Sequence, residues 1–113
     1  VYCGDDSLLH ANLNNNGAGC ITAAANVGCA VSQKVYSNWN NAAGEAAQGM
    51  LTAIRKAVTS VPLIPALKSL VARNTGDARW TIIRPPHTKL TAEQEAKLFA
   101  AFDASGLTLA KAA

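Results

Sequence analysis

Two short apolar segments at the start of the chain restrict its possible folds more than any other feature. The first, "VYC" at residues 1–3, is followed at once by Gly4 and is typical of the end of a buried strand. The second, "AGCITAAA" at residues 18–25, is too short to form a helix by itself, and Ile21 and Thr22 at its centre favour a buried strand.

The segment between these strands has the pattern of a short helix. "LLHANLNNN" at residues 8–16 follows Asp6 and Ser7, either of which can accept a hydrogen bond as the N-cap. Three asparagines and then Gly17 suit a left-handed helix end. The sequence therefore predicts a βαβ unit with two parallel strands.

A βαβ unit alone does not make a stable sheet. Two strands cannot cover both of their faces, and their outer edges leave backbone groups unpaired. We therefore expect further strands, and we expect them to precede residue 1.

The remainder of the chain is predicted to be helical. Four helices are expected, at residues 30–44, 45–60, 65–74 and 91–106, with an extended segment at 78–87. Gly44 and Gly76 are expected to end two of them, and Thr91 with Gln94 three residues later forms a capping box.

Composition excludes several classes of function. The net charge is only +3, and lysine and arginine are scattered without a basic run, which argues against a nucleic-acid surface. No apolar run approaches the ~20 residues of a membrane span. The three cysteines, Cys3, Cys20 and Cys29, form neither a disulfide framework nor a zinc motif with His10 or His87. Reduced thiols suit a cytoplasmic protein.

Three segments carry a resemblance to a known family. "VYCGDDSLL", "GAGCITAAANV" and "RPPHTKLTAEQEAKL" resemble, in this order, the C-terminal part of the dihydrodipicolinate synthase / N-acetylneuraminate lyase family. These enzymes are (β/α)8 barrels with added C-terminal helices, and they form a Schiff base between pyruvate and a lysine. The resemblance covers essentially the whole chain.

The resemblance implies a position in that barrel. Residues 1–42 would be the last two βα units, with "VYC" as the seventh strand and "CITAAA" as the eighth, and residues 43–113 the helical C-terminal region. The Schiff-base lysine and catalytic tyrosine of the family would both precede Val1. None of the lysines here is predicted to follow a strand (34, 56, 68, 89, 97 and 111). We therefore expect no catalytic residue in this chain, and an inactive segment when it is alone.

The resemblance also implies substrate-binding positions at the strand ends, where barrel active sites lie. Gly4 and Asp5 would face the second substrate, and Ile21 and Thr22 would border the Schiff base and that substrate. The structural alternative is that Asp6 caps the following helix, that Asp5 bonds within the turn, and that the second strand is ordinary core.

By resemblance, the function is that of a class I aldolase, lyase or synthase that joins or cleaves a carbon–carbon bond. The substrates would be pyruvate or a related 2-oxo acid and an aldehyde, with no metal or organic cofactor. The partners would be the N-terminal part of the same barrel and, in a homotetramer, further copies. The alternative class is a stand-alone helical interaction module, against which the open βαβ edges argue.

Overall fold

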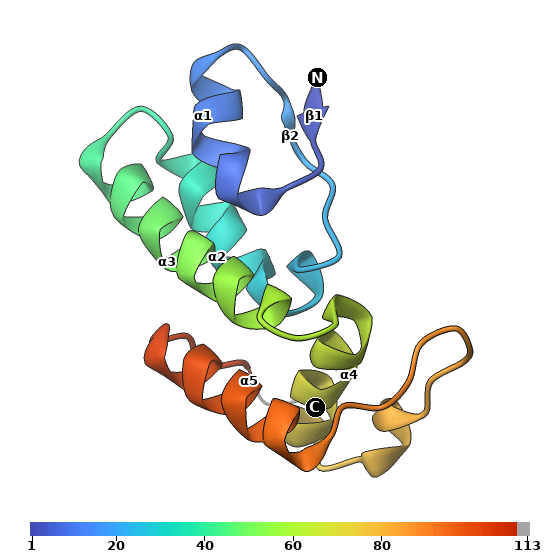
Figure 1. The fold of residues 1–113 in the computed structure, drawn as a ribbon. Helices are drawn as coiled ribbons and strands as arrows, with labels where there is room; N and C mark the ends of the chain where they lie inside the picture. Colours follow the sequence, from blue (N-terminus) through green and yellow to red (C-terminus); the bar gives the residue numbers. More distant parts are fainter. Residues whose placement is uncertain (111–113) are drawn as a thin grey trace. The chain divides into compact units, whose positions relative to one another are not determined.

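The computed structural model describes residues 1–110 (Figure 1). Its elements are β1 (Tyr2–Cys3), the 3-10 helix η1 (Asp6–Leu8), α1 (Leu9–Asn14), β2 (Gly19–Cys20), α2 (Ala25–Ser37), α3 (Ala42–Thr59), α4 (Leu63–Thr75), the 3-10 helix η2 (Ala78–Thr81) and α5 (Ala92–Ala104). The described residues form two compact units, which divide between Arg55 and Lys56. The predicted order of a βαβ unit followed by four helices is confirmed.

The two strands pair in parallel, with Tyr2 opposite Gly19 and Cys3 opposite Cys20. A second strand is present within residues 18–25, as predicted, but it is shorter than expected. β2 ends at Cys20, and a turn at residues 23–24 precedes α2. Alanine is the strongest helix former, so the alanine run after Thr22 leads into α2 instead of extending the sheet.

The end of α1 also differs from the prediction. Asn16, not Gly17, takes the left-handed conformation, with a φ of 61°. Gly17 is needed for a different reason: a side chain there would overlap the Asn12 side chain. The Asn12 amide donates to the Gly19 carbonyl over 2.9 Å, so this close approach ties α1 to β2.

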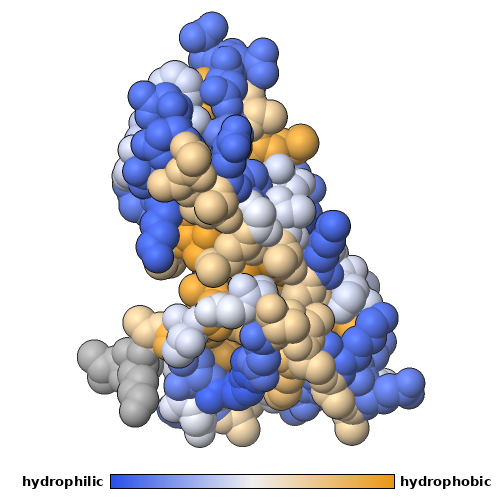
Figure 2. All heavy atoms as spheres, turned by 90° about the vertical axis from the view of Figure 1, so that its left-hand side faces the viewer, coloured by the Kyte–Doolittle hydropathy of each residue, from blue (hydrophilic) through white to orange (hydrophobic). Residues whose placement is uncertain are grey.

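The first unit has a core built from the apolar faces of its helices. Gly28 of α2 faces Leu51 and Ile54 of α3, and a Cβ at this position would make an ordinary contact with Leu51 at 3.4 Å. The buried apolar residues of this unit are Leu9, Leu13, Ala24, Val27, Val31, Val35, Leu51 and Ile54. Figure 2 shows hydrophilic residues gathered over the end of α1, where Asn14, Asn15 and Asn16 are exposed.

The second unit is held by α4 and α5. The capping box is confirmed: Thr91 Oγ1 accepts from the Gln94 N–H over 3.2 Å, and Gln94 Oε1 accepts from the Thr91 N–H over 2.9 Å. Arg73 of α4 donates to Asp103 of α5 over 2.8 Å and 3.1 Å. Gly76, with a φ of 70°, ends α4 as predicted.

The segment at 78–87 was predicted to be extended, and its first four residues are not. Asp77 Oδ1 accepts from the Arg79 N–H over 2.9 Å, and this cap starts η2.

Among the described residues, no single helix is long and apolar enough to cross a membrane, although α3 and α4 pass that test as a bent pair.

Gly44 does not end a helix, contrary to the prediction. The Asn41 side chain caps α3 by accepting from the Ala43 N–H over 2.9 Å, so Gly44 lies in the first turn of the helix. Gly44 is buried, and a Cβ there would overlap the backbone carbonyl of Asn38. Glycine at this position therefore permits the tight connection between α2 and α3.

We predict opposite effects of alanine at two glycines of α3. Gly44→Ala should lower the free energy of unfolding by roughly 1–3 kcal/mol, because the backbone of Asn38 has to move. Gly49→Ala should raise it by about 0.5–1 kcal/mol, because Gly49 is exposed and nothing lies within 4 Å of its Cβ position. Urea unfolding followed by circular dichroism measures both changes, and equal effects would contradict the proposed clash.

Candidate functional site

The turns that follow β1 and β2 lie at the same edge of the sheet, since parallel strands end on the same side. Gly4 and Asp5 follow β1, and Ile21 and Thr22 follow β2. The four residues predicted to bind substrate are therefore placed at one edge. Their contact with substrate remains a prediction.

Two of these four residues, Gly4 and Ile21, are exposed at this edge of the sheet. Gly4 is exposed, and a side chain added there would meet nothing within 4 Å. Ile21 is 73% exposed. Its N–H donates to the Cys3 carbonyl over 2.9 Å, which continues the parallel pairing one residue beyond β2.

Asp5 is the N-cap of η1. Its carboxylate accepts from the Ser7 N–H over 2.9 Å and from the Ser7 hydroxyl over 2.7 Å. These two hydrogen bonds, chiefly the one from the hydroxyl, hold the pKa of Asp5 below its ordinary value. The expectation that Asp6 or Ser7 is the cap was wrong, because the helix begins one residue earlier, at Asp6 itself.

Asp6 is fully buried, unlike its neighbour. Within residues 1–110, neither of its carboxylate oxygens receives a hydrogen bond of standard geometry. Its ion-pair partner is Arg55, whose Nη1 lies 3.5 Å from Asp6 Oδ1. Burial is the main cause that raises the pKa of Asp6. Its own backbone N–H, the positive charge of Arg55 and the Thr22 hydroxyl oppose this only in part. Asp6 is therefore a buried carboxyl group whose charged form depends on a few close neighbours.

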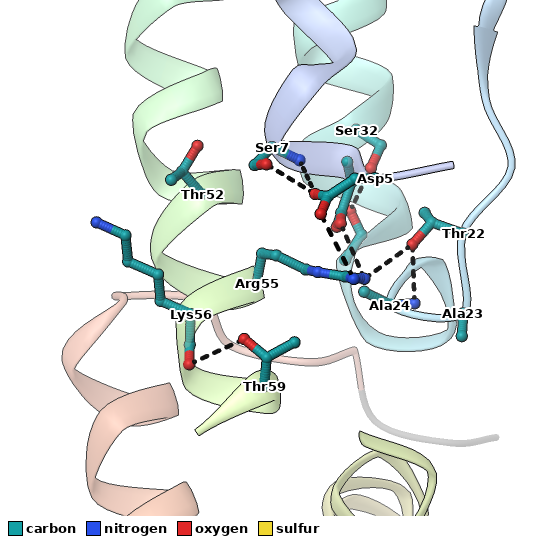
Figure 3. Close-up of polar contacts among 12 residues, drawn as sticks. Asp5, Ser7, Thr22, Ala23, Ala24, Ser32, Thr52, Arg55, Lys56 and Thr59 are labelled. Atoms are coloured by element: carbon teal, nitrogen blue, oxygen red, sulfur yellow. Dashed lines mark hydrogen bonds and ion pairs between the residues drawn. The ribbon is translucent and has the colours of Figure 1, made fainter. Parts of the chain in front are cut away.

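Arg55 of α3 reaches both turns (Figure 3). Its Nη2 lies 3.6 Å from Asp5 Oδ2, and its Nη1 donates to the Thr22 hydroxyl over 3.4 Å. The Thr22 hydroxyl also accepts from the Ala24 N–H over 3.3 Å. The two strand-end turns are thus joined through one guanidinium group.

Thr22 borders a hollow as well. A cavity of about 290 Å³ is lined by both strands, α1 and α2, and its walls include Cys20, Thr22, Cys29 and Ser32.

The three cysteines are free thiols. Burial, with the neighbouring Cys3 side chain, raises the pKa of Cys20 to about 12, so this thiol stays protonated.

A second side chain of α3 fixes the first turn. Gln48 Nε2 donates to the carbonyls of Asp6 and Ser7 over 3.1 Å and 3.2 Å. Gln48 Oε1 accepts from the His10 N–H over 2.9 Å. These three bonds tie α3 to the backbone of η1 and of the start of α1.

Sequence reasoning missed Asp6, Gln48 and Arg55 as site residues. The available signal was spacing: Gln48, Thr52 and Arg55 recur at i, i+4 and i+7, so they share one face of α3. Nothing in that spacing indicates which turn the face meets, so the partners could come only from the folded structure.

The lysines agree with the prediction in the region that the structure describes. Lys34, Lys56, Lys68 and Lys97 lie in helices and Lys89 lies in a loop, so none follows a strand. Lys111 lies outside the described residues.

No three His, Cys, Asp or Glu side chains of the described region are grouped so that they could hold a metal ion.

We predict that the two aspartates influence stability in opposite directions as the pH changes. The raised pKa of Asp6 means that its contribution is present below the ordinary value of 3.8 and is lost as the pH rises through the folded-state pKa. The lowered pKa of Asp5 means that its contribution is present above 3.8 and is lost as the pH falls.

Relative to the unmodified chain, Asp6→Asn should therefore gain stability with rising pH, and Asp5→Asn should lose it. Urea unfolding at several pH values between about 3 and 7 tests these slopes. Slopes of the same sign would contradict the assigned environments.

Comparisons with known proteins identify the family of the chain. A sequence model of the Dihydrodipicolinate synthetase family matches residues 1–105. An uncharacterized DapA-like lyase of Chloroflexus aurantiacus is 31% identical over 104 residues, which cover 91% of this chain. The match covers 34% of the relative, so the chain spans about a third of its length. The chain belongs to the dihydrodipicolinate synthetase family.

Proposed function

We propose that the chain supplies part of the active site of a pyruvate-dependent, Schiff-base-forming lyase or synthase. This part would bind the second substrate, the aldehyde. The observation that carries this proposal is the gathering of Asp5, Asp6, Thr22 and Arg55 at the carboxyl ends of two parallel strands. In a (β/α)8 barrel this edge is the face on which active sites are built.

In this proposal the chain forms the last two βα units of the barrel, with its helical region following. Within residues 1–110 the two parallel strands pair only with each other, and the two unpaired sheet edges support this position. The family membership and the lyase relative support the class of enzyme.

The chemistry would begin at a lysine elsewhere in the complete barrel. Its amine adds to the C2 carbonyl of pyruvate or a related 2-oxo acid, and water leaves to give a protonated imine. Loss of a C3 proton gives an enamine, whose carbon attacks an aldehyde while the aldehyde oxygen takes up a proton. Water then hydrolyses the product imine and frees the lysine; the reverse sequence cleaves the bond. No metal or organic cofactor is required by these steps.

The residues of this chain would bind and orient the aldehyde substrate. The Thr22 hydroxyl would donate to its carbonyl group, and the Asp5 carboxylate would accept from its hydroxyl groups. Gly4 leaves room beside them, and the Ile21 main-chain carbonyl would accept from the catalytic amine or its water.

The same proposal includes a location in a reducing cytoplasm, which suits the three free thiols, and assembly as a homotetramer.

Borohydride reduction in the presence of pyruvate tests the catalytic part. The complete enzyme should gain one reduced pyruvyl group per active site, on a lysine outside residues 1–113. The isolated 113-residue chain should gain none. Mass spectrometry locates the modification, and an adduct on any lysine of this chain would refute the assignment.

Removal of the Thr22 hydroxyl tests the substrate-binding part. In the complete enzyme, Thr22→Val should raise KM for the aldehyde about 5–20-fold, the loss of roughly one hydrogen bond, with pyruvate trapping little changed. Ser32→Ala is the control, since the Ser32 hydroxyl bonds to the Gly28 carbonyl inside α2. Equal losses of trapping and turnover would place Thr22 at the imine or in the fold instead.

A further inference from the structure

We infer that Arg55 is a positioning residue for the strand-end site, one that holds the Asp5–Asp6 turn and the Thr22 turn in register with each other. This inference rests on the proposed function for its catalytic consequence. The contacts that carry it are those of one guanidinium group with three side chains: Asp6 at 3.5 Å, Asp5 at 3.6 Å and Thr22 at 3.4 Å.

The shape of the side chain suits this role. A guanidinium group is planar and presents five N–H donors in fixed directions, so one arginine can face several acceptors at once. A lysine ammonium is a compact point charge and cannot hold the same three partners together. The Arg55 side chain is only 20% exposed, so water competes weakly for its donors.

The charge balance makes the turns depend on Arg55. Two carboxylates face one cation, and one of the carboxylates is fully buried. Removal of the cation would leave the buried charge of Asp6 uncompensated, which is costly in a medium of low dielectric constant. Asp6 would then either take up a proton or move toward water, and in both cases the substrate-facing edge would change.

The position of Arg55 in the chain adds a consequence. Arg55 lies on α3, beyond the two βα units that provide Gly4, Asp5, Ile21 and Thr22. The helical region that follows the barrel strands therefore contributes directly to the geometry of the site. Because Arg55 acts through Asp5, Asp6 and Thr22, its loss should weaken the binding of the aldehyde more than the formation of the imine with pyruvate.

Four forms of the complete enzyme test the inference: the unmodified protein, Arg55→Met, Arg55→Lys and Lys56→Met. Lys56 is the matched control, because it is the next residue of α3, carries the same charge and is exposed, and Figure 3 shows it pointing away from the carboxylates. Each form is also prepared with Asp6→Asn, so that the infrared band of the Asp6 carboxyl group can be assigned by its loss.

The first readout is the titration of Asp6 by infrared spectroscopy. The titratable groups that face Asp6 are Asp5, Arg55 and the Cys20 thiol. In Arg55→Met the protonated band should persist to higher pH than in the unmodified protein, because a favourable positive charge is lost. Arg55→Lys should restore the titration in part, and Lys56→Met should leave it unchanged. The same titration in Arg55→Met and the unmodified protein would overturn the inference.

The second readout is catalytic, with pyruvate and glyceraldehyde as the probes. Arg55→Met should raise KM for the aldehyde about tenfold, and borohydride trapping of pyruvate should stay within about twofold of the unmodified enzyme. An equal loss of trapping and turnover would show a general structural role and overturn the positioning role. If the unmodified enzyme traps no pyruvate, the proposed function fails, and the Asp6 titration still decides whether Arg55 governs this turn.

Discussion

The parallel pairing of β1 with β2 is the constraint on which the site depends. Because the strands run in the same direction, with Cys3 opposite Cys20, the residues that follow each strand emerge at one edge. The crossover through η1 and α1 is short, and the Asn12 side chain fixes its return to β2. Antiparallel pairing would place the Asp5–Asp6 turn and the Thr22 turn at opposite ends of the strands, beyond the reach of one arginine.

Helix α3 completes the site while it stabilises the first unit. Leu51 and Ile54 are fully buried in the core, and Gln48 and Arg55 bond to the turns. These two sets of residues alternate at helical spacing, so apolar packing fixes the rotation of the helix and thereby directs the polar side chains. Packing of the core and geometry of the site are therefore set by the same helix.

The sequence allowed the local features to be predicted and left the tertiary ones open. The capping box of Thr91 and Gln94 and the end of α4 at Gly76 depend on neighbours within four residues, and both were predicted. Gly17 and Gly44 were interpreted as helix stops, but each instead allows a close approach to another segment, which local patterns do not report. The four predicted substrate positions lie at one edge, whereas Arg55 required knowledge of which face of α3 meets the turns.

The way in which Gln48 holds the first turn has a consequence for the variation of this site. Its three bonds to the turn and to the start of α1 all go to main-chain atoms, the carbonyls of Asp6 and Ser7 and the N–H of His10. The bonds of Gln48 to the turn therefore do not depend on which side chains the turn carries. Arg55, on the same face of α3, contacts the carboxylates of Asp5 and Asp6 themselves. A substitution in the turn would therefore disturb the contacts of Arg55 and leave those of Gln48 in place, so α3 retains one hold on this backbone when the side chains change.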